Sequence, residues 1–179
     1  EEGEVWTLGY NTKFNDVTNL SASIYYSDID NAIVDNENYS DPANHHYINA
    51  KKEKRRGMEI SLNHEFSEHF SGYASYTYMQ IKQDVGNGFE RHTNEKPNTY
   101  RAGVKYKNAG WTYNADLTAV SGQKVRVLDA MGDYKAGYTD SNYFILDLGA
   151  EYKVNDNLKV FANVYNLTDA RYQEIGGLR

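Results

Sequence analysis

Residues 158–172 read LKVFANVYNLTDARY, and this stretch decides the fold that the sequence predicts. It begins as a run rich in Val, Phe and Tyr, which are residues typical of β-strands. It stops at the turn-forming cluster Asn166, Leu167, Thr168 and Asp169. One amphipathic strand followed by a loop is common in proteins. The stretch is informative because the chain before it repeats the same plan seven times.

Alternation of apolar and polar residues dominates the chain, and helical periodicity is nowhere sustained. Residues 100–107 are a clear case, with Tyr, Ala, Val and Tyr on one side and Arg, Gly, Lys and Lys on the other. Each run has about ten residues, close to what a tilted strand needs to cross a bilayer. The predicted strands cover residues 4–14, 20–27, 58–66, 70–82, 100–107, 111–119, 144–152 and 158–167.

The connections between these runs alternate strictly between short and long. Short turns are predicted at residues 15–19, 67–69, 108–110 and 153–157, and long connections at residues 28–54, 83–98 and 121–141. This layout is typical of an up-and-down transmembrane β-barrel with short periplasmic turns and long external loops. A soluble β-sandwich is the competing fold, but its strands have about 5–6 residues and nothing in it requires such alternation.

The composition agrees with an all-β membrane protein. The chain has 17 Tyr, 6 Phe and 2 Trp, and several of these aromatic residues stand beside the predicted short turns, as in the interfacial girdles of barrels. The mean hydropathy of -0.79 does not argue against a barrel, because only every second strand residue meets lipid. No run reaches the about 18 apolar residues of a membrane-spanning helix. Cysteine is absent, which excludes thiolate chemistry.

A resemblance to a known family is carried by DLGAEY at 147–152, NLKVF at 157–161, NVYNLTD at 163–169 and Tyr172. With these residues the sequence resembles the C-terminal barrel region of TonB-dependent outer-membrane receptors. In that family a strand ending in Asn-Leu-(Phe or Thr)-Asp, with Tyr a few residues later, lies just before the last strand. Residues 56–60 and 73–78 look like another hairpin of the family, whereas residues 4–14 match less well.

The resemblance implies a larger protein. The family has an N-terminal plug domain preceded by the TonB box, and it closes with a final strand that ends in an aromatic residue. Neither the plug domain with its TonB box nor the final strand is expected within residues 1–179. We therefore interpret these residues as a single β-barrel segment from the C-terminal portion of a barrel of about 22 strands. If the short turns are periplasmic, a segment of eight strands also begins and ends on the outer side of the membrane. Complete barrels of this family have both termini in the periplasm. Closure of the eight strands into a barrel of their own is the alternative.

By resemblance, the protein is a receptor and transporter of the bacterial outer membrane, in contact with outer-membrane lipid. It would bind a ferric siderophore, haem or cobalamin on its external loops. It would import this ligand with energy from the TonB complex, coupled through the plug, and without a resident cofactor. A small self-standing barrel acting as an adhesin or structural protein is the alternative, and a soluble β-sheet binding module is a third. A plug-like domain encoded upstream in the same reading frame would favour transport.

In the transport interpretation, charged residues of the strands line the lumen and meet the plug. Arg or Lys facing lipid at the bilayer midplane costs about 2–4 kcal/mol. The facing of residues 158–167 stays open, because they contain two apolar rows. One row consists of Leu158, Val160, Ala162 and Val164, and the other of Phe161, Tyr165 and Leu167. The predicted lumen-facing residues are Arg101, Lys105, Asp116, Asp147 and Glu151.

The candidate ligand-binding residues lie in the long connections. Adjacent histidines can ligate haem iron or another metal, although solvated loop histidines are more common. Arg and aromatic side chains suit an anionic or aromatic ligand such as a ferric siderophore, and they suit a solvated loop almost as well. The candidates are His45, His46, Tyr47, Arg91, His92, Arg126, Tyr134 and Tyr138.

Several other functions are not predicted. The sequence contains no recognisable nucleophile–base–acid set and no phosphate loop, so we do not predict an enzyme. The net charge of -6 comes without a basic stripe large enough for nucleic acid. The one basic run, at residues 51–56, is interpreted as a solvated strand end, with a phosphate site as the alternative.

Overall fold

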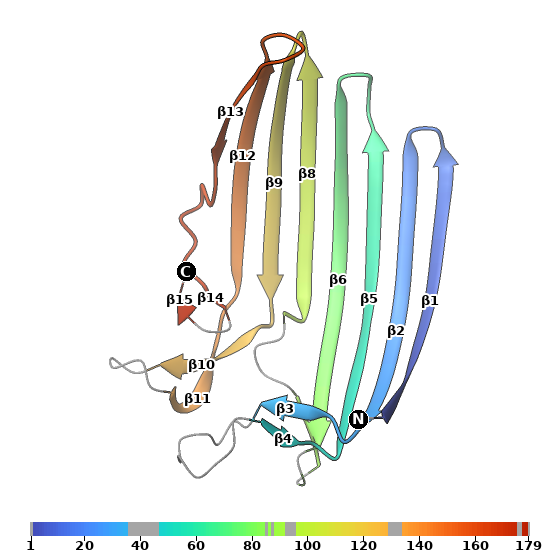
Figure 1. Cartoon of the computed structure of the whole chain (residues 1–179), viewed down its shortest axis with the longest axis vertical. Coiled ribbons are helices and arrows are strands. Elements are labelled where there is room, and N and C mark those ends of the chain that lie inside the picture. Colours follow the sequence, from blue (N-terminus) through green and yellow to red (C-terminus); the bar gives the residue numbers. More distant parts are fainter. Residues whose placement is uncertain are drawn as a thin grey trace.

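The computed structural model describes residues 2–35, 47–84, 86, 88–91, 96–128, 134–174 and 177–178. Its main feature is a single antiparallel sheet in which eight long strands lie side by side in chain order (Figure 1). The predicted fold class, an antiparallel up-and-down meander of about eight strands, is confirmed. The strands are β1 (Glu2–Asn15), β2 (Thr18–Asp30), β5 (Lys52–Glu65), β6 (Phe70–Asp84), β8 (Asn98–Asn108), β9 (Trp111–Ser121), β12 (Tyr143–Lys153) and β13 (Lys159–Val164).

Short and long connections lie at opposite ends of the sheet, here called the short-turn end and the long-connection end. Four tight turns join β1 to β2, β5 to β6, β8 to β9 and β12 to β13 at the upper end in Figure 1. Short strands lie at or near the lower end: β3 (Ile33–Asp35) with β4 (Tyr47–Asn49), β7 (Phe89–Arg91) beside β6, β10 (Lys124–Leu128) with β11 (Tyr134–Asp140), and β14 (Gln173–Glu174) with β15 (Gly177–Leu178).

The long connections were predicted too long. β2 continues to Asp30 and β5 begins at Lys52, within the stretch 28–54 that was expected to be a connection. Most of these added strand residues are charged, and opposite charges pair across the ladder: Lys52 Nζ lies 3.3 Å from Asp30 Oδ1, and Lys54 Nζ lies 3.7 Å from Asp28 Oδ2. Because polar residues stand at successive positions here, the apolar–polar alternation is lost, and the sequence did not predict these strand residues.

The sheet has two chemically different faces. Residues opposite one another in an antiparallel pair point to the same side, and the side alternates along each strand. The register therefore puts Leu8, Ile24, Met58 and Tyr78 on one side, here called the apolar face. The same face carries, two rows nearer the short-turn end, the row Leu20, Leu62, Ala74, Ala102, Leu117 and Leu146. Over the middle of the strands this face carries no Asp, Glu, Lys or Arg among the described residues.

Almost none of this apolar surface is covered. Leu8 is 69% exposed and Trp6 68%, and within the described residues the buried apolar side chains are limited to Ala32, Ala50, Val120 and Val125. A β-sandwich would stack a second sheet on this face at a distance of about 10 Å, and the described part of the chain supplies no such layer. An apolar surface of this size needs another covering, which lipid supplies for a barrel.

The sheet is open at both edges. β1 and β13 are the first and last strands of its order, and they do not pair with each other.

The described residues contain no helix with the length and hydrophobicity of a membrane span.

The register also decides the facing of the last long strand. Tyr152 lies opposite Val160, Ala150 opposite Ala162 and Leu148 opposite Val164, so these three β13 residues belong to the apolar face. Phe161 lies opposite Glu151 and takes the other side.

Candidate functional site on the polar face of the sheet

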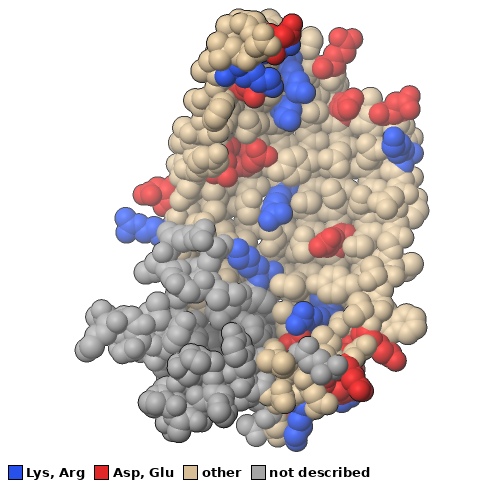
Figure 2. All heavy atoms as spheres, in the orientation of Figure 1, with Lys and Arg blue, Asp and Glu red and all other residues tan. Residues whose placement is uncertain are grey.

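The second side of the sheet, here called the polar face, carries the charged side chains of the strand interiors. Figure 2 shows basic and acidic residues scattered among uncharged ones across the middle of this face. Opposite residues in the ladder are Arg101 and Thr118, Lys105 and Asn114, Asp147 and Asp116, and Glu151 and Thr112. The five predicted lumen-facing residues therefore share this face. That this face lines a lumen stays a prediction.

Two carboxylates lie directly opposite each other in the middle of this face, Asp116 on β9 and Asp147 on β12. Like charges in such a position repel each other, but each carboxylate has its own donors. Tyr73 donates its hydroxyl to Asp116 Oδ1 at 2.8 Å, and Asn114 Nδ2 donates to Oδ2 at 3.1 Å. The backbone N–H of Asn166 donates to Asp147 Oδ1 at 2.7 Å. These bonds hold both carboxylates in place.

Glycine gives Tyr73 the room to reach Asp116. Tyr73 on β6 and Asp116 on β9 both lie opposite Gly103 on β8. A Cβ atom at Gly103 would collide with the Tyr73 ring and with Asp116 Oδ1. Glycine inside a strand often marks such a close approach. Tyr73 was not among the predicted residues of this face, and its signal in the sequence was this glycine within an otherwise regular strand.

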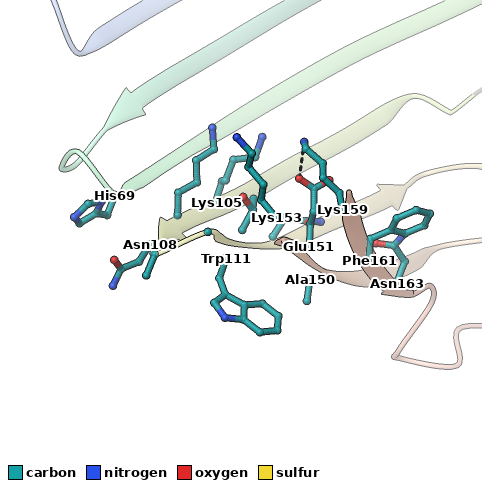
Figure 3. A pocket seen from close by; sticks show the side chains of 15 residues that line it. His69, Lys105, Asn108, Trp111, Ala150, Glu151, Lys153, Lys159, Phe161 and Asn163 are labelled. Carbon is teal, nitrogen blue, oxygen red and sulfur yellow. Dashed lines mark hydrogen bonds and ion pairs between the residues drawn. The ribbon is translucent and has the colours of Figure 1, made fainter. Parts of the chain in front are cut away.

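The short-turn end of the polar face carries a cluster of lysines around a hollow of about 730 Å³. In Figure 3, Lys105, Lys153 and Lys159 point to one side of the sheet, whereas Trp111 and Ala150 point to the other. Glu151 is the one carboxylate in the lining, and its Oε1 lies 2.8 Å from Lys159 Nζ. The lysine cluster consists of Lys105, Lys107, Lys153 and Lys159.

The lysine cluster has the chemistry of a surface that attracts anions. Lys159 is paired with Glu151, and Lys153 with Asp156 at 2.6 Å. For Lys105 and Lys107 the described part of the chain provides no ion pair. Their ammonium groups are therefore available to carboxylates or phosphates from outside the sheet.

The Asn-Leu-Thr-Asp segment forms the turn by which the chain leaves β13. Asn166 and Asp169 have left-handed backbone conformations, with φ values of 52° and 48°, which Asn and Asp tolerate better than most residues. Asn166 Oδ1 accepts from the N–H of Ala170 at 2.9 Å, and its Nδ2 donates to the carbonyl of Ala170 at 3.0 Å. The Thr168 hydroxyl donates to the carbonyl of Phe144 at 3.0 Å. These contacts define a structural turn.

The ring of Tyr172, the last residue of the predicted motif, stacks on Tyr143 with ring centroids 4.1 Å apart. This contact ties the chain beyond β13 back to the start of β12, next to the Thr168 bond to Phe144.

The candidate ligand-binding residues gather at the long-connection end, as far as they are described. Tyr47 lies in β4, Arg91 in β7, Arg126 in β10, and Tyr134 and Tyr138 in β11, and the structure describes their backbone only. β4, β10 and β11 lie at or near the lower end in Figure 1, and β7 pairs with the end of β6 there. Their role in ligand binding stays a prediction. His45, His46 and His92 lie outside the described residues.

The chain matches the family model described as "TonB dependent receptor-like, beta-barrel" over residues 1–167. The chain belongs to this family. It is 27% identical, over 190 aligned residues, to the "Probable TonB-dependent siderophore receptor PiuA" of Acinetobacter baumannii, with 96% of this chain and 24% of that protein covered. The resemblance inferred from residues 147–172 is thus confirmed.

Solved structures of TonB-dependent receptors share the fold. The copper transporter OprC superposes with a TM-score of 0.75 at 19% identity, covering 96% of this chain and 26% of that chain. The ferripyoverdine receptor of the outer membrane of Pseudomonas aeruginosa superposes with a TM-score of 0.69 at 21% identity, covering 95% and 24%. The chain thus spans about a quarter of the length of these relatives.

Family membership also fixes the location. TonB-dependent receptors are proteins of the bacterial outer membrane, and this chain belongs to that family, so the predicted location is confirmed. In this setting the exposed apolar face has a natural covering, because the outward face of a membrane barrel meets lipid.

Proposed function

We propose that this chain is part of an outer-membrane receptor that binds a scarce nutrient at the long-connection end and imports it with TonB-supplied energy. The observation that carries the proposal is the layout of the sheet. One face of the sheet is apolar and carries no charge over the described strand interiors. The opposite face is polar and carries Arg101, Asp116 and Asp147. Long connections collect at one end and tight turns at the other. In outer-membrane barrels the long connections are extracellular.

A ferric siderophore is the ligand class that we favour over haem and cobalamin. Siderophore complexes are often anionic and aromatic, and Arg and Tyr are residue types that bind such groups through charge-assisted hydrogen bonds and ring contacts. Arg126, Tyr134 and Tyr138 belong to one ladder at the long-connection end. The ladder pairs Arg126 with Tyr138 and Leu128 with Tyr134. The similarity to the siderophore receptor of A. baumannii supports the same class.

The polar face would guide the ligand inward and hold a plug domain. Asp116, Asp147 and Arg101 would contact the plug in the middle of the barrel, and the lysine cluster would contact it at the periplasmic end. TonB would act on the plug rather than on the strands. This division of roles rests on the family and on the charges of the polar face.

The test is ligand binding and uptake by the receptor expressed from its natural gene. We expect a ferric siderophore to bind more tightly than haem or cobalamin, and uptake to be lost in cells that lack TonB. Uptake that is unchanged without TonB would contradict the energy coupling. Tighter binding of haem or cobalamin would contradict the ligand class.

A paired substitution assigns the ligand-binding end. Arg126→Ala with Tyr138→Ala removes a charged and an aromatic group at the long-connection end. We expect siderophore binding to weaken by at least about tenfold, since hydrogen bonds to charged groups contribute about 1.5–3 kcal/mol. Lys13→Ala, at the opposite end of β1, is the control and should bind as the unsubstituted receptor does. Equal loss in both variants would contradict the assignment.

A further inference from the structure

Two long connections leave neighbouring strands at the long-connection end, and the residues where each one leaves are here called its root. The first root lies at Asn31, between β2 and β3, where the backbone is left-handed with a φ of 54°. Beyond it, β3 and β4 run across the direction of the long strands (Figure 1). The second root lies at the end of β6, which pairs with β7. Both connections carry candidate ligand-binding residues, Tyr47 in β4 and Arg91 in β7.

A buried carboxylate lies between the two roots. Glu53 on β5 is 2% exposed, and it lies opposite Ile29 on β2 and Gln83 on β6. The register puts all three side chains on the polar face. Each carboxylate oxygen has its own donor: Arg55 Nε donates to Oε1, and Gln83 Nε2 donates to Oε2 at 2.6 Å. These charge-assisted bonds fix the position of the carboxylate.

The first root packs beside this carboxylate. Ile29, the ladder neighbour of Glu53, contacts Ala32 and Ala50, which are both buried. The N–H of Ala50 donates to the carbonyl of Ala32 at 2.8 Å, so the two residues lead from β2 and β5 into β3 and β4. Because Ile29 points to the polar face, the bend at this root leads the chain toward that face.

The second root is joined to the first through the backbone as well. The N–H of Lys51 donates to the carbonyl of Asp84 at 2.8 Å, across the end of the ladder between β5 and β6. Asp84 Oδ1 accepts from the N–H groups of Gly86 at 2.8 Å and Gly88 at 3.1 Å, which shapes the start of the connection to β7. Gln83, which bonds to the buried carboxylate, directly precedes Asp84.

Stability alone does not explain a buried carboxylate at this position. Desolvation offsets much of the attraction between a carboxylate and a guanidinium, and apolar residues of similar volume often stabilise a fold equally well. Charge-assisted hydrogen bonds differ from apolar contacts because they require one arrangement of donor and acceptor. The bonds of Glu53 to Arg55 and Gln83 thus specify how the two roots are oriented.

We propose that Glu53 is a positioning residue for ligand binding. Its bonds to Arg55 and Gln83 hold the two roots in one orientation. They thereby set how Tyr47 and Arg91, one on each connection, are placed relative to each other. Glu53 is too buried to touch a ligand, so it acts through the connections. The proposal rests on the proposed function, in which the long-connection end binds a ferric siderophore.

The first test measures the link between the roots without a ligand. Gln83→Leu removes one donor from the carboxylate at the second root. Hydrogen exchange of the detergent-solubilised receptor is then read at the first root, at the N–H groups of Ala50 and Lys51. We expect both to exchange at least about tenfold faster, because the bond that orients this root is lost.

A glutamine on the other face of β6 provides the matched control. Gln80 Oε1 accepts from Arg56 Nε at 3.0 Å on the apolar face, so Gln80→Leu also removes one bond between β5 and β6. We expect this variant to change exchange at Ala50 and Lys51 by less than about twofold. Equal exchange in the two variants would overturn the proposal.

The second test separates the bonds of the carboxylate from its charge. Glu53→Leu removes both bonds. Glu53→Gln removes the charge only, because the introduced amide accepts from Arg55 and donates to Gln83 once the Gln83 amide turns over. We expect the affinity for a ferric catecholate siderophore to fall at least about tenfold in Glu53→Leu and less than about threefold in Glu53→Gln. Equal loss in both would overturn the proposal. If Glu53→Leu fails to fold, the exchange comparison still decides.

The two readouts also separate this proposal from the proposed function. Linked exchange of the roots in a receptor that binds and imports no siderophore would overturn the proposed function and leave Glu53 as the link between the connections. Siderophore binding that is unchanged in Glu53→Leu would overturn the positioning role alone.

Discussion

Asn166 shows how one residue can combine a backbone and a side-chain role. Its φ of 52° lies in the left-handed region, and its amide bonds to both the N–H and the carbonyl of Ala170. Asn166→Gly should keep the backbone conformation and lose the side-chain bonds, at a cost of about 1–3 kcal/mol in the local stability of the turn. Asn166→Ala should cost about 1 kcal/mol more, because alanine is disfavoured at positive φ. Hydrogen exchange of residues 166–172 measures the difference.

The decisive result for this turn is which of the two variants shows faster hydrogen exchange at residues 166–172. Equal exchange in Asn166→Gly and Asn166→Ala would mean that the left-handed conformation does not contribute. Unchanged exchange in both would mean that the bonds to Ala170 do not hold the turn. Global unfolding should change little, since these bonds lie at the end of β13 and not in the ladder.

Neighbouring residues of one strand should respond in opposite ways to the same substitution. Leu117 and Asp116 are adjacent in β9 and lie on opposite faces, and Leu146 is opposite Leu117 in the ladder. Leu117→Arg or Leu146→Arg should impair membrane insertion, because Arg facing lipid near the midplane costs about 2–4 kcal/mol. Asp116→Arg should insert normally while losing the Tyr73 bond. The amount of folded receptor in outer-membrane fractions measures insertion, and equal insertion of the three variants would contradict the facing.

Alternation along the strands predicted the elements, and it failed where charge replaced apolar residues. The pattern at residues 100–107 suffices to place β8 and to assign its two faces. Asp30 and Lys52 look like loop residues, because the ladder that pairs them joins positions far apart in the sequence. The same limitation applies to β13, whose two candidate apolar rows could be told apart only by its register with β12.

The candidate site could be predicted only in part for a related reason. Alternation is enough to put Arg101 and Asp116 on one face, but the contact between Tyr73 and Asp116 depends on the order of three strands and on a glycine between them. The basic run at residues 51–56 is divided by the pleat, with Lys54 and Arg56 on the apolar side and Arg55 on the polar side beside Glu53. A linear sequence cannot separate these neighbours without the register.

At the scale of the whole molecule, the eight long strands form an open sheet and not a closed barrel. Both edges, β1 and β13, present backbone groups with no partner strand among the described residues, and the apolar face is uncovered. Such edges favour aggregation. We therefore expect residues 1–179, expressed alone and refolded in detergent, to aggregate or remain unfolded, whereas the receptor expressed from its natural gene folds into a closed barrel.

Gel mobility with and without heating distinguishes the two outcomes, because a closed barrel resists SDS until it is boiled. The receptor should shift on heating and the isolated residues 1–179 should not. A heat-dependent shift of the isolated chain, with a monomeric mass, would mean that eight strands close alone. That result would favour the small self-standing barrel over the proposed receptor, because β1 and β13 would then pair with each other and leave no place for further strands.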